Sequence, residues 1–360
     1  MKRQQGFSMV ELMVAITLGL LLTGAVISVF VGSRAAYQAT AGVGDMADSG
    51  RFALDLIGES VRGAGNLACN SAMSATSQHV IPTVVSFINN FGQGIEGFEA
   101  INTGPNAGVA LPANPVVGAA NNWNPNLDAA MMAAIPGPFA PPVASPVQGS
   151  DVLVVRSSVP RVAPVYTTAD VSPGAVSLPV TPEPVALFLN QYAAIADCTK
   201  SVIFPVGALV PAGGVNVTVN AGLPGVGFSA GAVVAPLTTT IYYIGVGSDG
   251  DASLWRLEQL NGPGFGAPEE LVPDIENMQV LYGIDPAGTQ TAAAYVTADQ
   301  VAGNNVVSIR VALLVASPPS NKPPAAPAAY NMAGTQVTVP WDYRRRQVFY
   351  ATINLRDAVN

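Results

Sequence analysis

The pattern of hydrophobic and polar residues divides the chain into an apolar N-terminal segment and a longer mixed segment. Residues 12–33 carry no charged side chain and lie between Glu11 and Arg34. As a helix this run is about 33 Å long, which is enough to cross a hydrocarbon core of about 30 Å. Later apolar runs are short and are interrupted by proline or charge. The pattern therefore predicts a single membrane-spanning anchor and disfavours a channel or a transporter.

Helical spacing continues beyond the span over residues 34–62, although several glycines interrupt it. Apolar side chains recur here at intervals typical of a helix with one buried face. We therefore expect one long helix whose outer half packs on a head domain and ends near Gly63 or Gly65. The positions that we assign to the packing stripe are Tyr37, Ala41, Phe52, Leu56, Ala53 and Ile57.

Most of the remaining chain has the pattern of a β protein. Runs rich in β-branched and aromatic residues are each bounded by Gly, Pro, Asn or Asp, as strands are. The clearest hairpin surrounds Asp249-Gly250, a turn dipeptide between two strand patterns. A helix followed by such strands predicts an α+β fold, in which a long N-terminal helix, with a membrane half and a packing half, lies on an antiparallel β-sheet head with long loops. The predicted strands are 151–156, 201–206, 240–246, 253–259, 278–284, 306–315 and 347–355.

The segment from about 102 to 148 differs from its surroundings. It is rich in proline, glycine and asparagine, and its single charged residue is Asp128. Because proline removes the main-chain donors that helices and paired strands need, neither element can run far here. We expect a long loop or insertion. Two interpretations stay open at this stage, a variable surface excursion and a contact site for a partner.

Charge narrows the range of partners. The chain has 15 Lys plus Arg against 23 Asp plus Glu, and a formal net charge of −8. Such an acidic chain is poorly suited to neutralise phosphates, so we expect no direct contact with nucleic acid. The exception is the run Arg344, Arg345 and Arg346. No further basic repetition accompanies these arginines, which favours a solvated strand start over a DNA site.

Candidate catalytic and metal-binding residues are few. The single histidine, His79, lies in a Ser/Thr-rich loop without a nucleophile motif, so we expect a surface histidine and no hydrolase triad. Residues 92–97 match GxGxxG, but no βαβ pattern surrounds them. Asp249 and Asp251 are weak calcium candidates because the further ligands of an EF-hand are missing, and a plain turn is favoured. The sequence thus predicts no cofactor and no enzyme; the competing class, a membrane-anchored secreted enzyme, needs a convergent polar pocket.

The two cysteines, Cys69 and Cys198, are far apart in the sequence. In a head that is translocated to an oxidising compartment, such a pair is expected to form a disulfide, here between the end of the long helix and the sheet. The chain-entropy relation gives that bond roughly 4–5 kcal/mol. Two free buried thiols are the alternative. A zinc site is disfavoured, since it needs more ligands than two distant cysteines and one histidine.

The N-terminus holds the most specific motif. A short basic leader ends at Gly6, Phe7 follows, and Glu11 directly precedes the apolar run. An ordinary secretory signal with a small-residue cleavage site at 39–41 is one interpretation, but such a signal has a shorter apolar core and no carboxylate at its start. A carboxylate at the centre of a bilayer costs up to about 3 kcal/mol, so Glu11 needs a partner. Capping of the helix start is the alternative role for Glu11.

This order of residues resembles the processing and methylation signature of type IV prepilins and pseudopilins. The resemblance implies that a prepilin peptidase cleaves between Gly6 and Phe7 and methylates the new amine of Phe7. It also implies that Glu11 faces this amine in a neighbouring subunit, where the pairing offsets the desolvation of both charges. The implied organisation is a cleaved leader at 1–6, a transmembrane and assembly helix at 7–33, an outer helix half at 34–65 and a β-rich periplasmic head at 66–360.

Further segments resemble the large minor pilins of the PilW type. They begin with Gly50-Arg-Phe-Ala-Leu-Asp-Leu-Ile and Cys69, and continue with several strand patterns in the same order. The resemblance implies a minor pilin that initiates or caps assembly of a type IV pilus, with other minor and major pilins and an inner-membrane assembly platform as partners. It implies one pass through the inner membrane, a periplasmic head and later incorporation into the extracellular pilus. The alternatives are a large minor pseudopilin of a type II secretion system and a pilus-tip adhesin that uses the 102–148 insertion.

Overall fold

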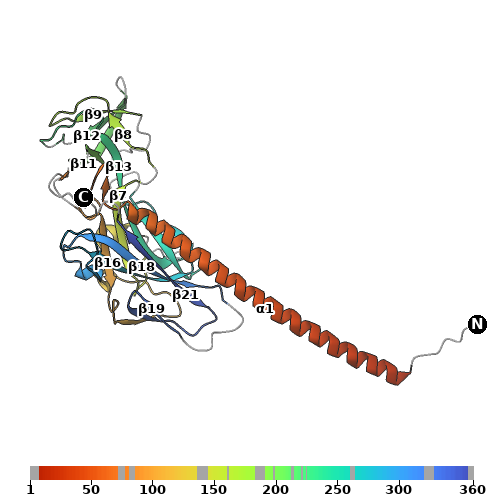
Figure 1. Ribbon diagram of the computed structural model, residues 1–360. Coiled ribbons are helices and arrows are strands. Elements are labelled where there is room, and N and C mark those ends of the chain that lie inside the picture. The colour runs from red at the N-terminus through yellow and green to blue at the C-terminus, as the bar shows by residue number, and fades with distance from the viewer. Residues whose placement is uncertain are drawn as a thin grey trace, which may run out of the picture.

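A single long helix, α1 (Met9–Arg62), carries the head of the molecule at its C-terminal end (Figure 1). The side chain of Ser8 caps the first turn by accepting the N–H of Val10 at 3.2 Å. At the other end, the N–H of Gly63 donates to the carbonyl oxygen of Ser60 at 3.1 Å, so the helix ends where the glycines predict. The computed structural model describes residues 8–71, 78–80, 86–135, 145–159, 162–182, 191–197, 199–211, 215–219, 222–223, 225–259, 264–319 and 328–355.

The head consists mainly of antiparallel strands, which confirms the α+β fold. In the part of the chain that the structure describes, the strands form a 12-stranded sheet, a 4-stranded sheet, a 3-stranded sheet and a 2-stranded pair. The short helical elements are η2 (Ala120–Asn122), α2 (Ala129–Ala134) and η3 (Ala298–Gln300). The strands are β1 (Asn66–Leu67), β2 (Asn70–Ser71), β3 (Gln78–Val80), β4 (Ile95–Ala100), β5 (Gly108–Ala110), β6 (Trp123–Asn124), β7 (Val152–Ser158), β8 (Val165–Thr167), β9 (Ser177–Thr181), β10 (Tyr192–Ala196), β11 (Ser201–Pro211), β12 (Val215–Val219), β13 (Val233–Val246), β14 (Ala252–Glu258), β15 (Glu269–Pro273), β16 (Ile275–Ile284), β17 (Ala294–Val296), β18 (Val306–Ala316), β19 (Ala329–Met332), β20 (Thr335–Thr338) and β21 (Arg346–Asn354).

The long strand β13 joins two parts of the head. Its first residues pair with β8 and β10, whereas its second half pairs with β7 and β14. We call β8 to β12 together with the first residues of β13 the distal lobe; Figure 1 places it beyond the C-terminal end of α1. Its apolar cluster, which includes Leu178, Phe204 and Val217, contains no residue of α1. The distal lobe therefore has a core of its own.

The second part of the head rests on α1. The 4-stranded sheet, in the order β17-β16-β18-β21, faces the second half of β13 with β7 and β14, and α1 packs along β18 and β21. Leu153 and Tyr242 meet Met278, Ile309 and Leu313 between the two sheets, each at most 2% exposed. The main core thus lies between the sheets and is closed on one side by the helix.

The packing face of α1 is a narrow stripe. Met46, Ala53, Ile57 and Val61 are each at most 4% exposed. Gly50 lies in the same stripe because the ring of Phe349 on β21 occupies the place where its Cβ would be. Gly50, one of the glycines that interrupt the helical pattern, is therefore a position at which the sheet closely approaches the helix.

The structure corrects part of the predicted stripe. Ala53 and Ile57 are buried as predicted, and Leu56 is partly buried against the same core. Tyr37, Ala41 and Phe52 are exposed, so these three predictions were wrong. The reason is that the head covers only one side of the helix. Helical spacing alone does not show at which residue of the helix the contact with the head begins.

The insertion at 102–148 is also corrected, because its described part contributes to the core. Within it, β6 pairs with β4, and the carboxylate of Asp128 caps α2 by accepting the N–H of Ala130 at 2.7 Å. Trp123, Leu127 and Met131 are each at most 4% exposed and pack on the 12-stranded sheet. Apolar residues recur here every fourth position, a pattern that the count of prolines conceals.

The strands predicted from alternation are present, with ends that differ by a few residues. The Asp249-Gly250 hairpin is confirmed. Strands β13 and β14 pair on either side of it, beginning with Val246 opposite Ala252, and Gly250 has a positive φ of 90°. His79 lies in the short strand β3, parallel to β11, rather than in the loop that we expected. A strand of three residues is too short for alternation to reveal.

Candidate functional site

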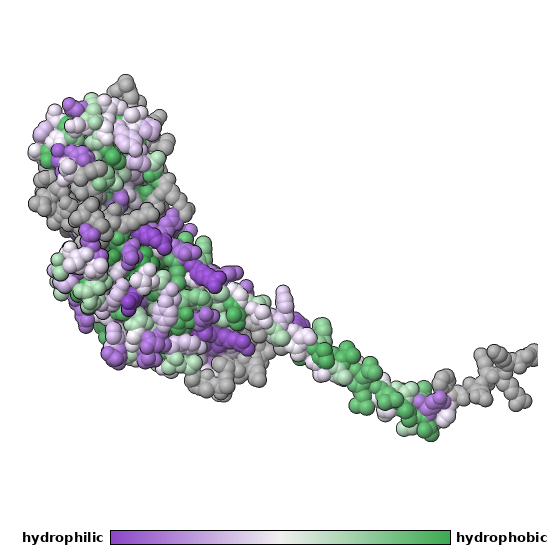
Figure 2. Space-filling view, in the orientation of Figure 1, coloured by the Kyte–Doolittle hydropathy of each residue, from purple (hydrophilic) through white to green (hydrophobic). Residues whose placement is uncertain are grey.

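The N-terminal half of α1 is an apolar rod that the head does not cover. By length and composition, residues 9–34 form the one helix able to cross a membrane in the described part of the chain, and none of them is buried. Figure 2 shows this half as a largely hydrophobic surface. The hydroxyls of Thr17, Thr23 and Ser28 donate to carbonyl oxygens of the preceding turn at 2.7–2.9 Å. They therefore add no unpaired donor to a surface that suits lipid or other apolar helices.

Glu11 is the one charged side chain between Ser8 and Arg34. It lies exposed in the first turn of α1, where the positive end of the helix dipole favours a carboxylate. Within the described part of the chain Glu11 forms no ion pair, and an apolar layer makes an unpaired charge costly. Gly6 and Phe7, the predicted processing residues, lie outside the described residues. The pairing of Glu11 with the amine of a neighbour's Phe7 therefore stays a prediction.

Cys69 lies in the turn between β1 and β2 and is not a free thiol, whereas Cys198 lies outside the described residues. Two residues before Cys69, Leu67 shares an apolar cluster with Ala194 of β10 and Ile203 of β11. Strand β10 ends two residues before position 198. This packing supports the predicted Cys69–Cys198 disulfide, which stays a prediction.

Two protein families match the chain. Residues 1–27, which include Gly6, Phe7 and Glu11, match the prokaryotic N-terminal methylation motif. Residues 241–357 match the family of type IV pilus-assembly protein W. The chain is a PilW-type type IV pilin. Comparisons with curated proteins and with solved structures find no match.

The PilW match coincides with the part of the head that rests on the helix. It begins in the second half of β13 and ends just after β21, so it includes the 4-stranded sheet that packs along α1. The family is one of structural pilin subunits rather than of enzymes. Membership implies a membrane-anchored protein that interacts with other components of a pilus.

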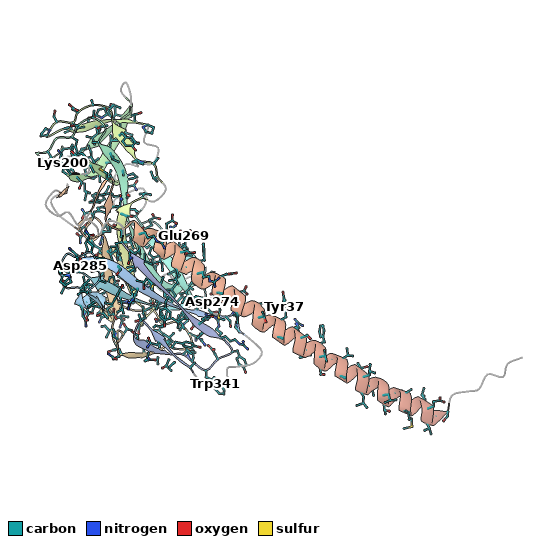
Figure 3. The ribbon with its side chains drawn as sticks, viewed as in Figure 1. Tyr37, Lys200, Glu269, Asp274, Asp285 and Trp341 are labelled. Atoms are coloured by element: carbon teal, nitrogen blue, oxygen red, sulfur yellow. The ribbon has the colours of Figure 1, made fainter. Side chains whose placement is uncertain are left out.

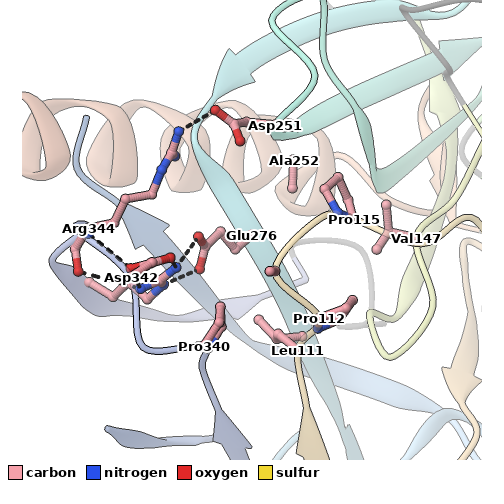
Figure 4. A pocket seen from close by; sticks show the side chains of 12 residues that line it. Leu111, Pro112, Pro115, Val147, Asp251, Ala252, Glu276, Pro340, Asp342 and Arg344 are labelled. Atoms are coloured by element: carbon pink, nitrogen blue, oxygen red, sulfur yellow. Dashed lines mark hydrogen bonds and ion pairs between the residues drawn. The ribbon is translucent and has the colours of Figure 1, made fainter. Parts of the chain in front are cut away.

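Within the matched region, the three consecutive arginines of this PilW-type pilin have different surroundings, which corrects the prediction of a solvated strand start. Arg344 donates to Asp274 at 2.8 Å and also to Asp251, as Figure 4 shows for the latter. The side chain of Arg346 is 2% exposed. Arg345 is exposed. Two of the three arginines are therefore part of the folded head, so the run is not a continuous exposed basic surface.

Arg346 is held by carboxylates on two sides. Its Nε and Nη2 atoms donate to Glu276 at 2.5 and 2.9 Å, and its Nη1 and Nη2 atoms donate to Asp342 at 2.8 and 2.5 Å. Burial lowers the pKa of the Arg346 guanidinium, but the bonds to Asp342 and Glu276 more than offset this and raise it. Burial raises the pKa of Glu276, while Arg346 lowers it. The buried side chains stay charged because they are paired and hydrogen-bonded.

The cavity beside Arg346 has a volume of about 50 Å³, which is too small for an organic ligand.

The weak metal candidates Asp249 and Asp251 form the turn that the sequence favours. The carboxylate of Asp249 accepts the N–H of Asp251 at 3.0 Å. Oxygens of these two residues and of Asp274 lie within 4.8 Å of one another. The guanidinium of Arg344 already pairs with Asp251 and Asp274, so the cluster has its counter-charge and we assign no metal to it.

The GxGxxG stretch borders a cavity of about 360 Å³. The wall combines glycine backbone with the amides of Gln93, Asn304 and Asn305, and none of the described residues that line it is charged. Gly94 packs against the backbone of Gly65, which explains a glycine at this position. Gly97 lies in β4, where the hydroxyl of Tyr282 covers it. Gly94 and Gly97 therefore serve close packing, and the stretch continues into strand β4 rather than into a helix N-terminus that could hold a phosphate.

Asp151 links the two large sheets. It directly precedes β7 and is 2% exposed, and its carboxylate accepts the N–H groups of Ala100 on β4 at 3.0 Å and of Val280 on β16 at 2.8 Å. Ser150 reinforces the link, since its hydroxyl accepts the N–H of Met278 at 3.0 Å. Sequence reasoning missed this connection between β4, β7 and β16.

Glu99 lies beside Asp151 and is 6% exposed. One carboxylate oxygen accepts the hydroxyl of Thr103 at 3.0 Å, while the other has no hydrogen-bond partner in the described part of the chain. Burial raises the pKa of Glu99 to about 7, although the bond from Thr103 lowers it. Burial and the charge of Glu99 also raise the pKa of Asp151. The pair therefore binds protons more tightly in the folded chain than in the unfolded chain.

The pKa of Glu99 predicts that the head loses stability as the pH rises. Below about pH 4 the side chain is neutral in both states, whereas between about pH 4.5 and 7 only the unfolded chain ionises. The free energy of unfolding should fall by an amount on the order of 3 kcal/mol across that window. Glu99→Gln should flatten the fall, and Asp55→Asn on the exposed face of α1 should not. Urea unfolding at several pH values checks this; identical pH profiles for Glu99→Gln and wild type would contradict it.

Proposed function

We propose that this PilW-type pilin initiates or caps the assembly of a type IV pilus from a tip position. The observation that carries the proposal is the distal lobe, which lies beyond Gly63 at the end of α1 and away from the membrane span (Figure 1). In a fibre with bundled N-terminal helices, the next subunit toward the tip would place its head in the space beyond the C-terminal end of α1. A subunit that fills this space with its own lobe accepts neighbours on its membrane side only.

Assembly would use the chemistry of α1. When the subunit leaves the membrane, residues 9–34 exchange contacts with lipid for contacts with other helices. Because both surroundings are apolar, the hydrophobic free energy changes little. Glu11 then sets the register, because pairing with the amine of a neighbour's Phe7 satisfies both charges only in one position. Breaking a buried pair by removing one partner costs about 3–5 kcal/mol, which is enough to select that position.

The pseudopilin and adhesin alternatives differ from this proposal in their location and in their surface. A pseudopilin of a type II secretion system has the same signature and helix, so the site of the protein in the cell separates the two roles. An adhesin role for the 102–148 insertion is limited to its exposed residues, because Trp123, Leu127 and Met131 pack in the core.

Immunogold labelling of sheared pili tests the proposed position. We expect gold at one end of each fibre, and at least a tenfold fall in pilus number when the gene is deleted. Gold spread along the fibre, or a normal pilus number without the protein, would overturn the tip role. Glu11→Gln removes the charge with little change of shape, so this variant should reach the membrane but be absent from the sheared fraction. Thr17→Val, on the same apolar rod, is the matched control and should be incorporated like wild type.

A further inference from the structure

In the described part of the chain, residues 340–345 lie at the end of the head nearest the membrane span. The N–H of Ser317 donates to the carbonyl oxygen of Arg345 at 2.8 Å, and Ser317 in turn lies next to Gly42, near the first turn of α1 that the head touches. Figure 3 shows Trp341 at this end of the head, at about the same level along α1 as Tyr37. We call Tyr37, Trp341, Tyr343 and Arg345 the membrane-proximal rim.

Side chains alternate along the loop that forms the rim. Asp342, Arg344 and Arg346 turn inward, where Asp342 accepts the N–H of Arg344 at 2.9 Å and pairs with the guanidinium of Arg346. The intervening Trp341 and Tyr343 are 63% and 53% exposed, and Arg345 is exposed as well. On the helix, Tyr37 is 75% exposed. The buried ion pairs thus hold this loop in place, and both aromatic side chains stay more than half exposed.

The length of the span places the rim at the surface of the membrane. Residues 9–34 are 26 in number and form a helix of about 39 Å, longer than a hydrocarbon core of about 30 Å. Arg34 therefore reaches the headgroup layer, and Tyr37 lies less than one further turn away. Spanning helices tilt by about 20° on average, and a tilt toward the head brings Trp341 and Tyr343 lower still.

We propose that the rim contacts the lipid headgroup layer while the pilin is anchored in the membrane before assembly. The contact then fixes the tilt of the head. Trp and Tyr prefer this layer because their rings are amphipathic, and arginine tolerates it. The contact is aromatic rather than electrostatic, because the chain has a net charge of −8 and its described surface includes the exposed carboxylates of Asp45, Asp48 and Asp249. The proposal rests on anchoring by α1 and not on the tip position in the fibre.

Fluorescence quenching by brominated lipids tests the proposal on the full chain. Of the three tryptophans, Trp123 and Trp255 are 1% and 4% exposed in the head, so a quencher in the bilayer reaches Trp341 selectively. The protein is reconstituted in phosphatidylethanolamine vesicles in which the acyl chains carry bromine either near the headgroups or near the bilayer centre. We expect a loss of fluorescence that is larger with the shallow bromines, persists at high salt and disappears in Trp341→Phe.

Three other results would overturn the proposal. They are equal fluorescence in brominated and plain vesicles, equal quenching of wild type and Trp341→Phe, and a loss that high salt abolishes. Flotation of the same vesicles shows whether α1 has inserted, so a chain that floats without quenching refutes the rim contact and leaves the anchor intact. Tyr166→Phe, in the distal lobe, is the matched control and should be quenched like wild type.

Discussion

Replacing Arg346 with methionine is expected to lower the free energy of unfolding by about 3–5 kcal/mol. The guanidinium is 2% exposed and is the shared counter-charge of Glu276 and Asp342. Methionine keeps much of the apolar stem but leaves two carboxylates together in a poorly solvated site. Burial already raises the pKa of Glu276 in the presence of the arginine. Without it, Glu276 must bind a proton or carry an unpaired charge, and both outcomes weaken the contact between β16 and β21.

Urea unfolding of the full chain in a non-ionic detergent, followed by far-UV circular dichroism, measures this loss. Arg345→Met is the matched control, since Arg345 is the next residue and is exposed. Its effect should stay within about 0.5 kcal/mol. Equal midpoints for the two variants would show that the buried network does not stabilise the head.

Trp123→Ala is expected to cost a similar amount, about 3–5 kcal/mol. The indole is 1% exposed, its ring covers Gly118, and its Nε1 donates to the carbonyl oxygen of Ser150 at 2.8 Å. Truncation leaves a cavity on the 12-stranded sheet and removes the partner of a buried carbonyl beside Asp151. The insertion would then lose its main attachment to the sheet.

Thermal unfolding of the same detergent-solubilised chain checks this second prediction. Trp123→Phe keeps most of the packing and should lose about 1 kcal/mol for the missing hydrogen bond. Trp341→Ala, at an exposed position, should leave the midpoint almost unchanged. A midpoint for Trp123→Ala that equals that of Trp341→Ala would mean that the insertion is a loop outside the core, as the sequence first indicated.

The elements that follow from local patterns were predictable from the sequence. The membrane span needs only an uncharged run of sufficient length, and the end of α1 near Gly63 needs only a glycine after the last helical turn. The β13–β14 hairpin follows from Asp249-Gly250 between two strands. The N-terminal signature, with Gly6, Phe7 and Glu11, is short and contiguous, which is why it identified the family at once.

Features that depend on distant partners were not predictable from the sequence. Arg344 and Arg346 look like a solvated run until β16 supplies Glu276 and the turns supply Asp251 and Asp274. Asp151 looks like the polar start of a strand until its carboxylate meets the N–H of Val280. An acidic or basic residue directly beside an apolar strand run is the one local signal that these buried groups offer, and exposed strand ends have the same signal.

We propose that the chain enters a pilus through a processed N-terminal helix. Intact-mass and N-terminal analysis of the protein from its native host, with the peptidase present, tests this most directly. We expect a mature chain that begins at N-methylated Phe7, and loss of that form in Gly6→Ala. A chain that begins at Gly42, after cleavage of an ordinary signal, would contradict entry into a pilus by this route, because it would lack both the anchor and Glu11.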